Sequence, residues 1–278
     1  MKNKGNLFLT LLVLTCMVTT SLADTPGVQT LTLNTGFDHS ANAKYPAPGS
    51  YPSAGDPRDA YWILVRDTST TGNTTPRSSS IMPKYGSAWA NPFSDTEWIS
   101  YVKNGVPTSN GSHFRDYVFE KCFCVKKGAL TNKENMENAR LDISFRADDY
   151  GAVYLNESLT NITSQTIPTN PFTSLNTPAP YSILSGSLTS GGFNLPSPPA
   201  STVIKGRELL KRLKEGRNCL QFKVVDLGLV VSGYDLTGSL TLSGIEEVEK
   251  FNERAKRPEF SQCSSCSRRQ GPKSEESQ

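Results

Sequence analysis

The sequence predicts an all-β protein, an antiparallel β-sandwich with one or two short helices. Apolar and polar residues alternate with period two in several segments, which is the period of a strand with one buried face. Stretches rich in Gly, Pro, Ser, Thr and Asn separate these segments, and the 278 residues include 21 Gly and 18 Pro. The chain shows no regular alternation of strands with long helices, which argues against a parallel α/β sheet.

The expected strands are rich in β-branched, aromatic and leucine residues. In chain order they are Val28 to Leu33, Ala60 to Val65, Phe114 to Val125, Leu141 to Ala147, Val153 to Leu155, Leu220 to Val225 and Leu236 to Leu242. Leu141, Ile143 and Phe145 would share one face, and Gly238 interrupts the last strand. Two facing sheets of such strands can bury their alternate residues between them.

Two helices are expected. Arg207 to Lys214 contains strong helix formers and is followed by Gly216. Ile245 to Lys256 places three apolar residues on one helical stripe, Val248, Phe251 and Ala255. The segments expected to be surface loops are Tyr45 to Pro57, Thr68 to Ser80 and Ile162 to Ser201.

The ends of the chain predict export. Residues 1–23 have the pattern of a signal peptide, with Lys2 and Lys4 before an apolar run and small residues up to Ala23, where cleavage is expected. Acylation at Cys16 is the alternative. We therefore expect a secreted, periplasmic or cell-surface protein without a transmembrane segment. Its sandwich would span residues 24–244, an amphipathic helix residues 245–257 and a disordered polar tail with a CxxC pair residues 258–278.

The cysteines after the signal are expected to form disulfides, as is usual in an oxidising compartment. The candidates are Cys122, Cys124, Cys219, Cys263 and Cys266. We predict a bond from Cys122 or Cys124 to Cys219, provided that their strands are neighbours. The spacing of the last two cysteines also suits half of a zinc site, but the sequence offers no matching second half.

Charge and histidine content exclude several function classes. The formal charge is +3 and falls to +1 once Lys2 and Lys4 are removed, so no excess of positive charge points to nucleic acid. His39 and His113 are the only histidines, and no Gly-x-Ser-x-Gly motif is present. A serine hydrolase triad or a zinc hydrolase site is therefore not expected.

The stretch ADDYG at residues 147–151, here called the acidic bend, is the strongest candidate in the sequence for a catalytic or metal site. Asp148 and Asp149 are adjacent, and adjacent strand residues point to opposite faces, so they cannot act as the paired carboxylates of a glycosidase. They can instead accept backbone N–H bonds in a turn while Gly151 supplies the bend. The sequence therefore predicts a non-enzymatic protein.

Two motifs carry a family resemblance. Residues 145–156, FRADDYGAVYLN, and residues 209–224, LLKRLKEGRNCLQFKV, resemble in order and separation two segments of galactose-binding-domain-like jelly rolls, which include carbohydrate-binding modules of secreted bacterial proteins. Trp89-Ala90-Asn91-Pro92 and Glu97-Trp98-Ile99 also resemble a segment of such proteins. The sequence departs from the pattern at Glu157, where the family has glycine, and in the length of the loop from Ile162 to Ser201. The resemblance implies a jelly-roll sandwich, and sugar binding is among the functions of that fold.

Aromatic residues near loops point to the same ligand class, because a flat ring can lie against the C–H face of a sugar. We predict that Trp89, Tyr150, Asp148 and Asp149 lie at one rim of the sandwich and bind a polysaccharide or surface glycan, and that Trp62 and Trp98 pack in the core. The alternative is a structural or adhesive surface protein without a sugar site, whose partner is another protein. No cofactor is expected, although Asp148, Asp149 and Asn156 could contribute to a structural calcium site.

Overall fold

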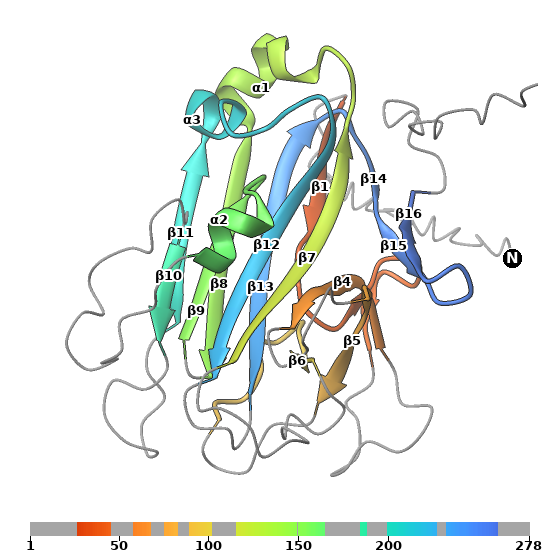
Figure 1. The fold of residues 1–278 in the computed structure, drawn as a ribbon. Coiled ribbons are helices and arrows are strands. Elements are labelled where there is room, and N and C mark those ends of the chain that lie inside the picture. Colours follow the sequence, from red (N-terminus) through yellow and green to blue (C-terminus); the bar gives the residue numbers. More distant parts are fainter. Residues whose placement is uncertain are drawn as a thin grey trace, which may run out of the picture.

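The computed structural model describes residues 27–45, 58–67, 75–82, 89–101, 115–148, 150–164, 184–187, 199–226 and 232–260. In this part of the chain most elements are strands, and the strand pairs are antiparallel (Figure 1). Three short α-helices and one turn of 3-10 helix accompany them. The predicted all-β class is confirmed.

The main sheet has 12 strands. Neighbours follow the order β10-β9-β12-β7-β4-β5-β6-β13-β8-β11, with β1 added to β13 and β14 added to β7. The bounds are β1 Val28–Thr32, β4 Arg58–Asp67, β5 Arg77–Met82, β6 Trp98–Ser100, β7 Arg115–Val125, β8 Arg140–Asp148, β9 Tyr150–Leu155, β10 Leu184–Ser187, β11 Ala200–Lys205, β12 Gly216–Asp226, β13 Gly233–Ser243 and β14 Ile245–Val248.

This sheet curls so that one half faces the other, which is compatible with a β-sandwich. Strands β9, β12 and β7 form one layer, and β8 and β13 lie in the layer opposite (Figure 1). Ring contacts join the layers: Phe222 of β12 lies 4.8 Å from Phe145 of β8 and 4.2 Å from Tyr234 of β13. Aromatic rings therefore fill part of the core, between the two layers of the curled sheet.

The apolar residues that alternate with polar ones along the strands form that core. Every second residue of β8 is buried, and Leu141, Ile143 and Phe145 belong to the main core cluster as the sequence predicts. Gly238 lies where β13 passes close to β8, and a Cβ atom at this position would collide with the carbonyl oxygen of Asp142. The interruption seen in the sequence is thus a close approach of two backbones.

Small elements cover the outside of the sandwich. Two ribbons, β2 (Phe37–Asp38) with β3 (Ala43–Lys44) and β15 (Lys250–Asn252) with β16 (Arg257–Glu259), form separate two-stranded sheets. The helices are η1 Ala129–Thr131, α1 Lys133–Asn138, α2 Leu159–Ser164 and α3 Gly206–Leu210. Among the described residues, no helix is both long and apolar enough to cross a membrane.

Several sequence predictions are wrong. The segment from Ile245 to Lys256 is not a helix: β14 pairs with β7, and β15 pairs with β16. Two predicted loops contain strands, because β5 begins inside Thr68 to Ser80, and β10 and the start of β11 fall inside Ile162 to Ser201. The helix expected over Arg207 to Lys214 is present but shorter, as α3. Residues 1–23 and 261–278 lie outside the described residues.

Candidate functional site

Trp89, the first residue of the predicted sugar site, is buried. Its side chain is 3% exposed and lies in a small cluster with Met82 and Trp98, its ring centroid 4.2 Å from that of Trp98. The indole N–H donates to a carboxylate oxygen of Asp148 at 2.7 Å. The expectation that Trp89 is an exposed rim residue is therefore wrong, because a partner distant in sequence satisfies its polar atom.

Tyr150 is also buried, but in a different place. It is 9% exposed and lies in a cluster with Tyr154 of the same strand and Ile162 of α2. This cluster is distinct from both the main core and the cluster of Trp89. Trp89 and Tyr150 thus do not form one aromatic platform for a sugar ring.

Asp148, the described carboxylate of the acidic bend, makes contacts within the protein that stabilise the fold. Besides binding Trp89, Asp148 accepts a hydrogen bond at its backbone carbonyl from the hydroxyl of Ser232, at 3.2 Å. Asp149 lies outside the described residues. Asn156 is at the far end of β9, six residues long and so about 20 Å in length. Asp148 and Asn156 are therefore too far apart to share one calcium ion.

The segment around Trp89 is tied to the sheet by a buried charge. Asp235 of β13 accepts the backbone N–H of Phe93 at 3.0 Å and lies 3.7 Å from the guanidinium of Arg146. Arg146 also donates to the carbonyl of Asn91 at 2.7 Å. Burial raises the pKa of the Asp235 carboxyl to about 6, against the opposing effect of these donors.

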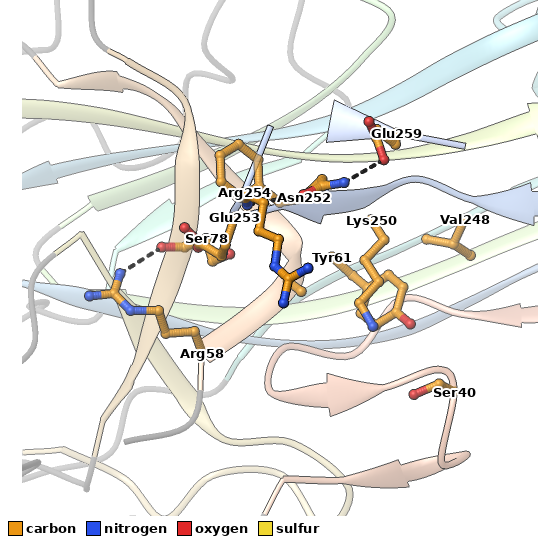
Figure 2. Close-up of a pocket in the computed structure, with 12 residues that line it drawn as sticks. Ser40, Arg58, Tyr61, Ser78, Val248, Lys250, Asn252, Glu253, Arg254 and Glu259 are labelled. Atoms are coloured by element: carbon orange, nitrogen blue, oxygen red, sulfur yellow. Dashed lines mark hydrogen bonds between the residues drawn. The ribbon is translucent and has the colours of Figure 1, made fainter. Parts of the chain in front are cut away.

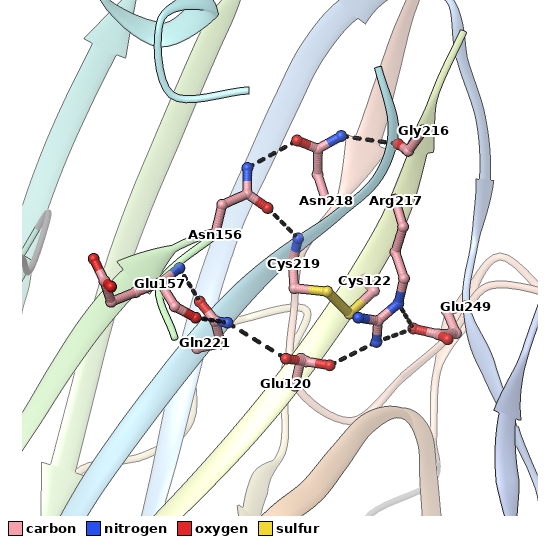
Figure 3. Close-up of a disulfide and its surroundings, with 10 residues drawn as sticks. All are labelled: Glu120, Cys122, Asn156, Glu157, Gly216, Arg217, Asn218, Cys219, Gln221 and Glu249. Atoms are coloured by element: carbon pink, nitrogen blue, oxygen red, sulfur yellow. Dashed lines mark hydrogen bonds and ion pairs between the residues drawn. A yellow bond between two sulfur atoms is a disulfide. The ribbon is translucent and has the colours of Figure 1, made fainter. Parts of the chain in front are cut away.

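A disulfide joins Cys122 of β7 to Cys219 of β12, as one of the two predicted pairings has it. These residues are direct partners in the register of the two strands, with Cα atoms 4.1 Å apart (Figure 3). Cys124 is disulfide-bonded as well, and its partner lies outside the described residues. Cys263 and Cys266 fall in that outer part of the chain.

Charged residues surround the disulfide on the outer face of the sheet. The guanidinium of Arg217 lies 2.6 Å from Glu120 and 2.7 Å from Glu249 (Figure 3). Glu120, Cys122, Cys219 and Glu249 together could hold a metal ion by proximity. In the oxidised protein, however, the sulfurs bind each other and the carboxylates bind Arg217, so this set is a structural network.

A second polar cluster lies at the end of the core near β4. Lys121 and Asp59 are fully buried; Asp59 accepts backbone N–H bonds from Gly36, Tyr61 and Trp62 at 2.7 to 3.0 Å. Burial lowers the pKa of Lys121 to about 8, and Asp59 opposes that effect. Burial and the charge of Lys121 lower the pKa of the neighbouring His39 to about 2, so this imidazole is neutral at physiological pH. The cluster holds the entry of β4 in place.

Next to this cluster the surface is hollowed into a groove between β4 and the ribbon β15–β16. Its volume is about 700 Å³ (Figure 2). Tyr61 and Phe251, which are both buried, line it together with two smaller apolar residues, Ala60 and Val248. Its charged lining residues are Arg58, Lys250, Glu253, Arg254 and Glu259. We call this hollow the β15 groove.

No protein-family model, curated protein or solved structure matches this chain. The resemblance to galactose-binding-like jelly rolls is therefore carried by the quoted motifs alone. Those motifs do occupy strands in the structure, since residues 145–156 cover the end of β8 and all of β9, and residues 216–224 begin β12.

The β15 groove was not predicted from the sequence. Its lining comes from Ser40 after β2, from β4 and β5, and from the segment from Val248 to Glu259, which is expected from the sequence to be a helix and a tail. Arg58 and Tyr61 of β4 are far in sequence from Lys250 and meet it only because the ribbon folds back over β4. No local motif encodes that contact.

Proposed function

We propose that this chain is an exported, non-enzymatic β-sandwich module that binds carbohydrate, and that the β15 groove is its site. The groove itself carries this proposal: a volume of about 700 Å³ lies in the range of small-molecule sites and accommodates a short stretch of sugar chain. Tyr61 and Phe251 line it but are buried, at 5% and 3% exposure, so contacts to a ligand fall to the exposed side chains around them.

The hydrogen bonding of Asp148 in the acidic bend supports a binding role rather than catalysis. The side chain of Asp148 is bound to the indole of Trp89 at 2.7 Å, and this hydrogen bond holds the carboxylate against the protein. Export is supported by the disulfide between Cys122 and Cys219, since such bonds persist in oxidising compartments.

A second candidate is a structural or adhesive surface protein without a sugar site, whose partner is another protein. The burial of Trp89 and Tyr150 favours it, because an open aromatic platform was the feature expected of the sugar binder. The β15 groove favours the first candidate, because its volume of about 700 Å³ is that of a small-molecule site.

Binding of the purified protein to intact cells of the producing organism tests the two candidates. Periodate oxidises the vicinal hydroxyls of surface glycans and is expected to abolish binding, whereas protease treatment of the cells is expected to leave it. Loss after protease alone would establish the second candidate. Absence of binding to untreated cells would contradict both.

A further inference from the structure

The uncharged polar side chains of the β15 groove are already engaged within the protein. The hydroxyl of Ser78 donates to Glu253 at 2.7 Å, and the amide of Asn252 donates to Glu259 at 2.8 Å. The Asn252 oxygen accepts two backbone N–H bonds, and the hydroxyl of Ser40 donates to Asp38. Neutral sugars are recognised mainly through such amides and hydroxyls, which here are occupied.

The two acidic residues of the groove are neutralised by cations outside it. Glu253 forms an ion pair with Lys256 at 3.0 Å, and Glu259 forms one with Arg257 at 2.9 Å. Each carboxylate therefore has a neighbouring cation outside the groove, and Glu253 is in addition within electrostatic reach of Arg58.

The three cations that line the groove have no such partners. Within the part of the chain that the structure describes, Arg58, Lys250 and Arg254 make no ion pair. All three are exposed. Arg58 donates only to the carbonyl of Ser78 at 3.3 Å, and the ammonium of Lys250 lies 5.7 Å from the ring centre of Tyr61 (Figure 2). The groove thus carries three exposed cations that make no ion pair among the described residues, while its two carboxylates are paired with cations outside it.

We propose that the β15 groove binds an acidic polysaccharide, a sugar chain that carries carboxylate or sulfate groups. The anionic groups of such a chain would reach the exposed side chains of Arg58, Lys250 and Arg254. This inference rests on the proposed carbohydrate function and narrows its ligand class.

An acidic peptide is the competing occupant and fits the groove less well. A peptide brings one backbone N–H and one C=O group per residue, and each needs a partner when it is buried. The cations can serve only acceptors, and the oxygen atoms of Asn252, Glu253 and Glu259 are already bound to the protein. A uronate chain has hydroxyl groups in their place, which can rotate towards water or accept hydrogen bonds from the cations.

Titration calorimetry of the full chain tests this proposal with oligogalacturonate, its methyl ester, a sulfated dextran, neutral dextran and polyglutamate. The ester is the matched neutral control, because only the charge is removed. We expect binding to oligogalacturonate or to the sulfated dextran, weaker binding at higher salt and none to the two neutral sugars. The acidic sugar that binds distinguishes carboxylate from sulfate as the recognised group.

The variant Arg58→Gln with Lys250→Gln and Arg254→Gln is expected to lose about tenfold or more in affinity, since each exposed charge contributes modestly. The matched control is Lys127→Gln with Lys133→Gln and Lys205→Gln, which removes the same charge from exposed lysines outside the groove. The control should keep its affinity within about twofold.

The possible failures are distinguishable. Equal loss of affinity in both triple variants, or equal binding of the ester and the acid, would overturn the acidic-ligand inference and leave the carbohydrate function in place. Binding of polyglutamate as tightly as the acidic sugars would overturn the choice of a glycan. No binding to any of the sugars would overturn the inference, and loss of cell binding after periodate would then still support a carbohydrate ligand of another kind.

Discussion

At the scale of the residue, side chains that the sequence predicts to contact a ligand contact each other within the protein instead. Trp89 and Asp148 are 59 positions apart and meet through one hydrogen bond of 2.7 Å. The carboxylate of Asp148 is half-buried, so removal of its donor costs more than the bond itself, because part of its desolvation is no longer offset. The pair therefore stabilises the fold, and its disruption should appear as a loss of stability.

Trp89→Phe is expected to lower the free energy of unfolding by about 1 to 3 kcal/mol, through the lost indole donor and the smaller ring. Asp148→Asn is the matched control, because the amide oxygen can still accept the indole N–H and should cost about 1 kcal/mol or less. Urea unfolding measures both. An unchanged midpoint for Trp89→Phe would show that the indole is not packed in the cluster with Met82 and Trp98.

Asp235 makes stability depend on pH. Burial raises its folded-state pKa to about 6, above the value near 4 of an unfolded chain. The folded state therefore binds more protons between these values, so this contribution to stability is fully present below about pH 4 and is lost as pH rises through about 6. Asp235→Asn cannot ionise and lacks this dependence.

The difference in unfolding free energy between Asp235→Asn and the unchanged protein should thus shift in favour of the variant between about pH 4 and pH 7, by up to about 3 kcal/mol. Other groups, including His39 with its lowered pKa, cancel in this difference. Urea unfolding at the two pH values measures it. A difference independent of pH would show that Asp235 is ionised throughout the range.

At the scale of the element, period-two alternation located the long strands and missed the short ones. The alternation of β8 marked Leu141, Ile143 and Phe145 correctly, because both its faces have distinct environments. β11 also alternates, but between half-buried and exposed residues, so its sequence lacks the apolar face that predicts a strand. Its pairing with β8 is a tertiary contact that cannot be predicted from the sequence of the segment alone.

The segment after Gly244 shows how tertiary pairing overrides a local pattern. Val248, Phe251 and Ala255 fit a helical stripe, yet Ile245 and Val248 pair with β7, and Phe251 is buried over β4. Strand β7 offers β14 a line of unpaired backbone groups, and hydrogen bonds to that line replace those of a helix. The β15 groove exists only because of this outcome.

The register between β13 and β8 depends on a missing side chain. Gly238→Ala would drive a Cβ atom into the backbone of Asp142, so we expect a loss of about 2 kcal/mol or more. Ser239→Ala, at the next position and half-buried, should change stability by about 0.5 kcal/mol or less. Thermal unfolding of the two variants compares them. Equal midpoints would contradict the close approach of the strands.

The cysteine pairing fixes β7 beside β12. Digestion of the denatured, non-reduced protein with trypsin and chymotrypsin should release residues 218–222 linked to residues 122–123, since cleavage after Phe123 separates Cys122 from Cys124. The peptide of Cys124 should be linked to another cysteine, and mass spectrometry will identify it. Recovery of Cys219 linked to Cys124 would contradict the observed register.

At the scale of the whole molecule, the fold class and most long strands could be predicted, but the proposed ligand site could not. The predicted rim residues Trp89 and Tyr150 belong to two buried clusters, and aromatic identity near a loop does not distinguish burial from exposure. The β15 groove is assembled from β4, β5 and the folded-back ribbon, and is visible only in three dimensions.

The central claim is that the ligand is bound at the β15 groove and not at the rim around Trp89 and Tyr150. Hydrogen exchange of the full chain, measured by mass spectrometry with and without oligogalacturonate or the sulfated dextran, tests it most directly. We predict slower exchange in residues 58–61 and 248–259 and unchanged exchange in residues 89–101 and 150–155. Protection of the latter two segments, with none along the groove, would contradict the account.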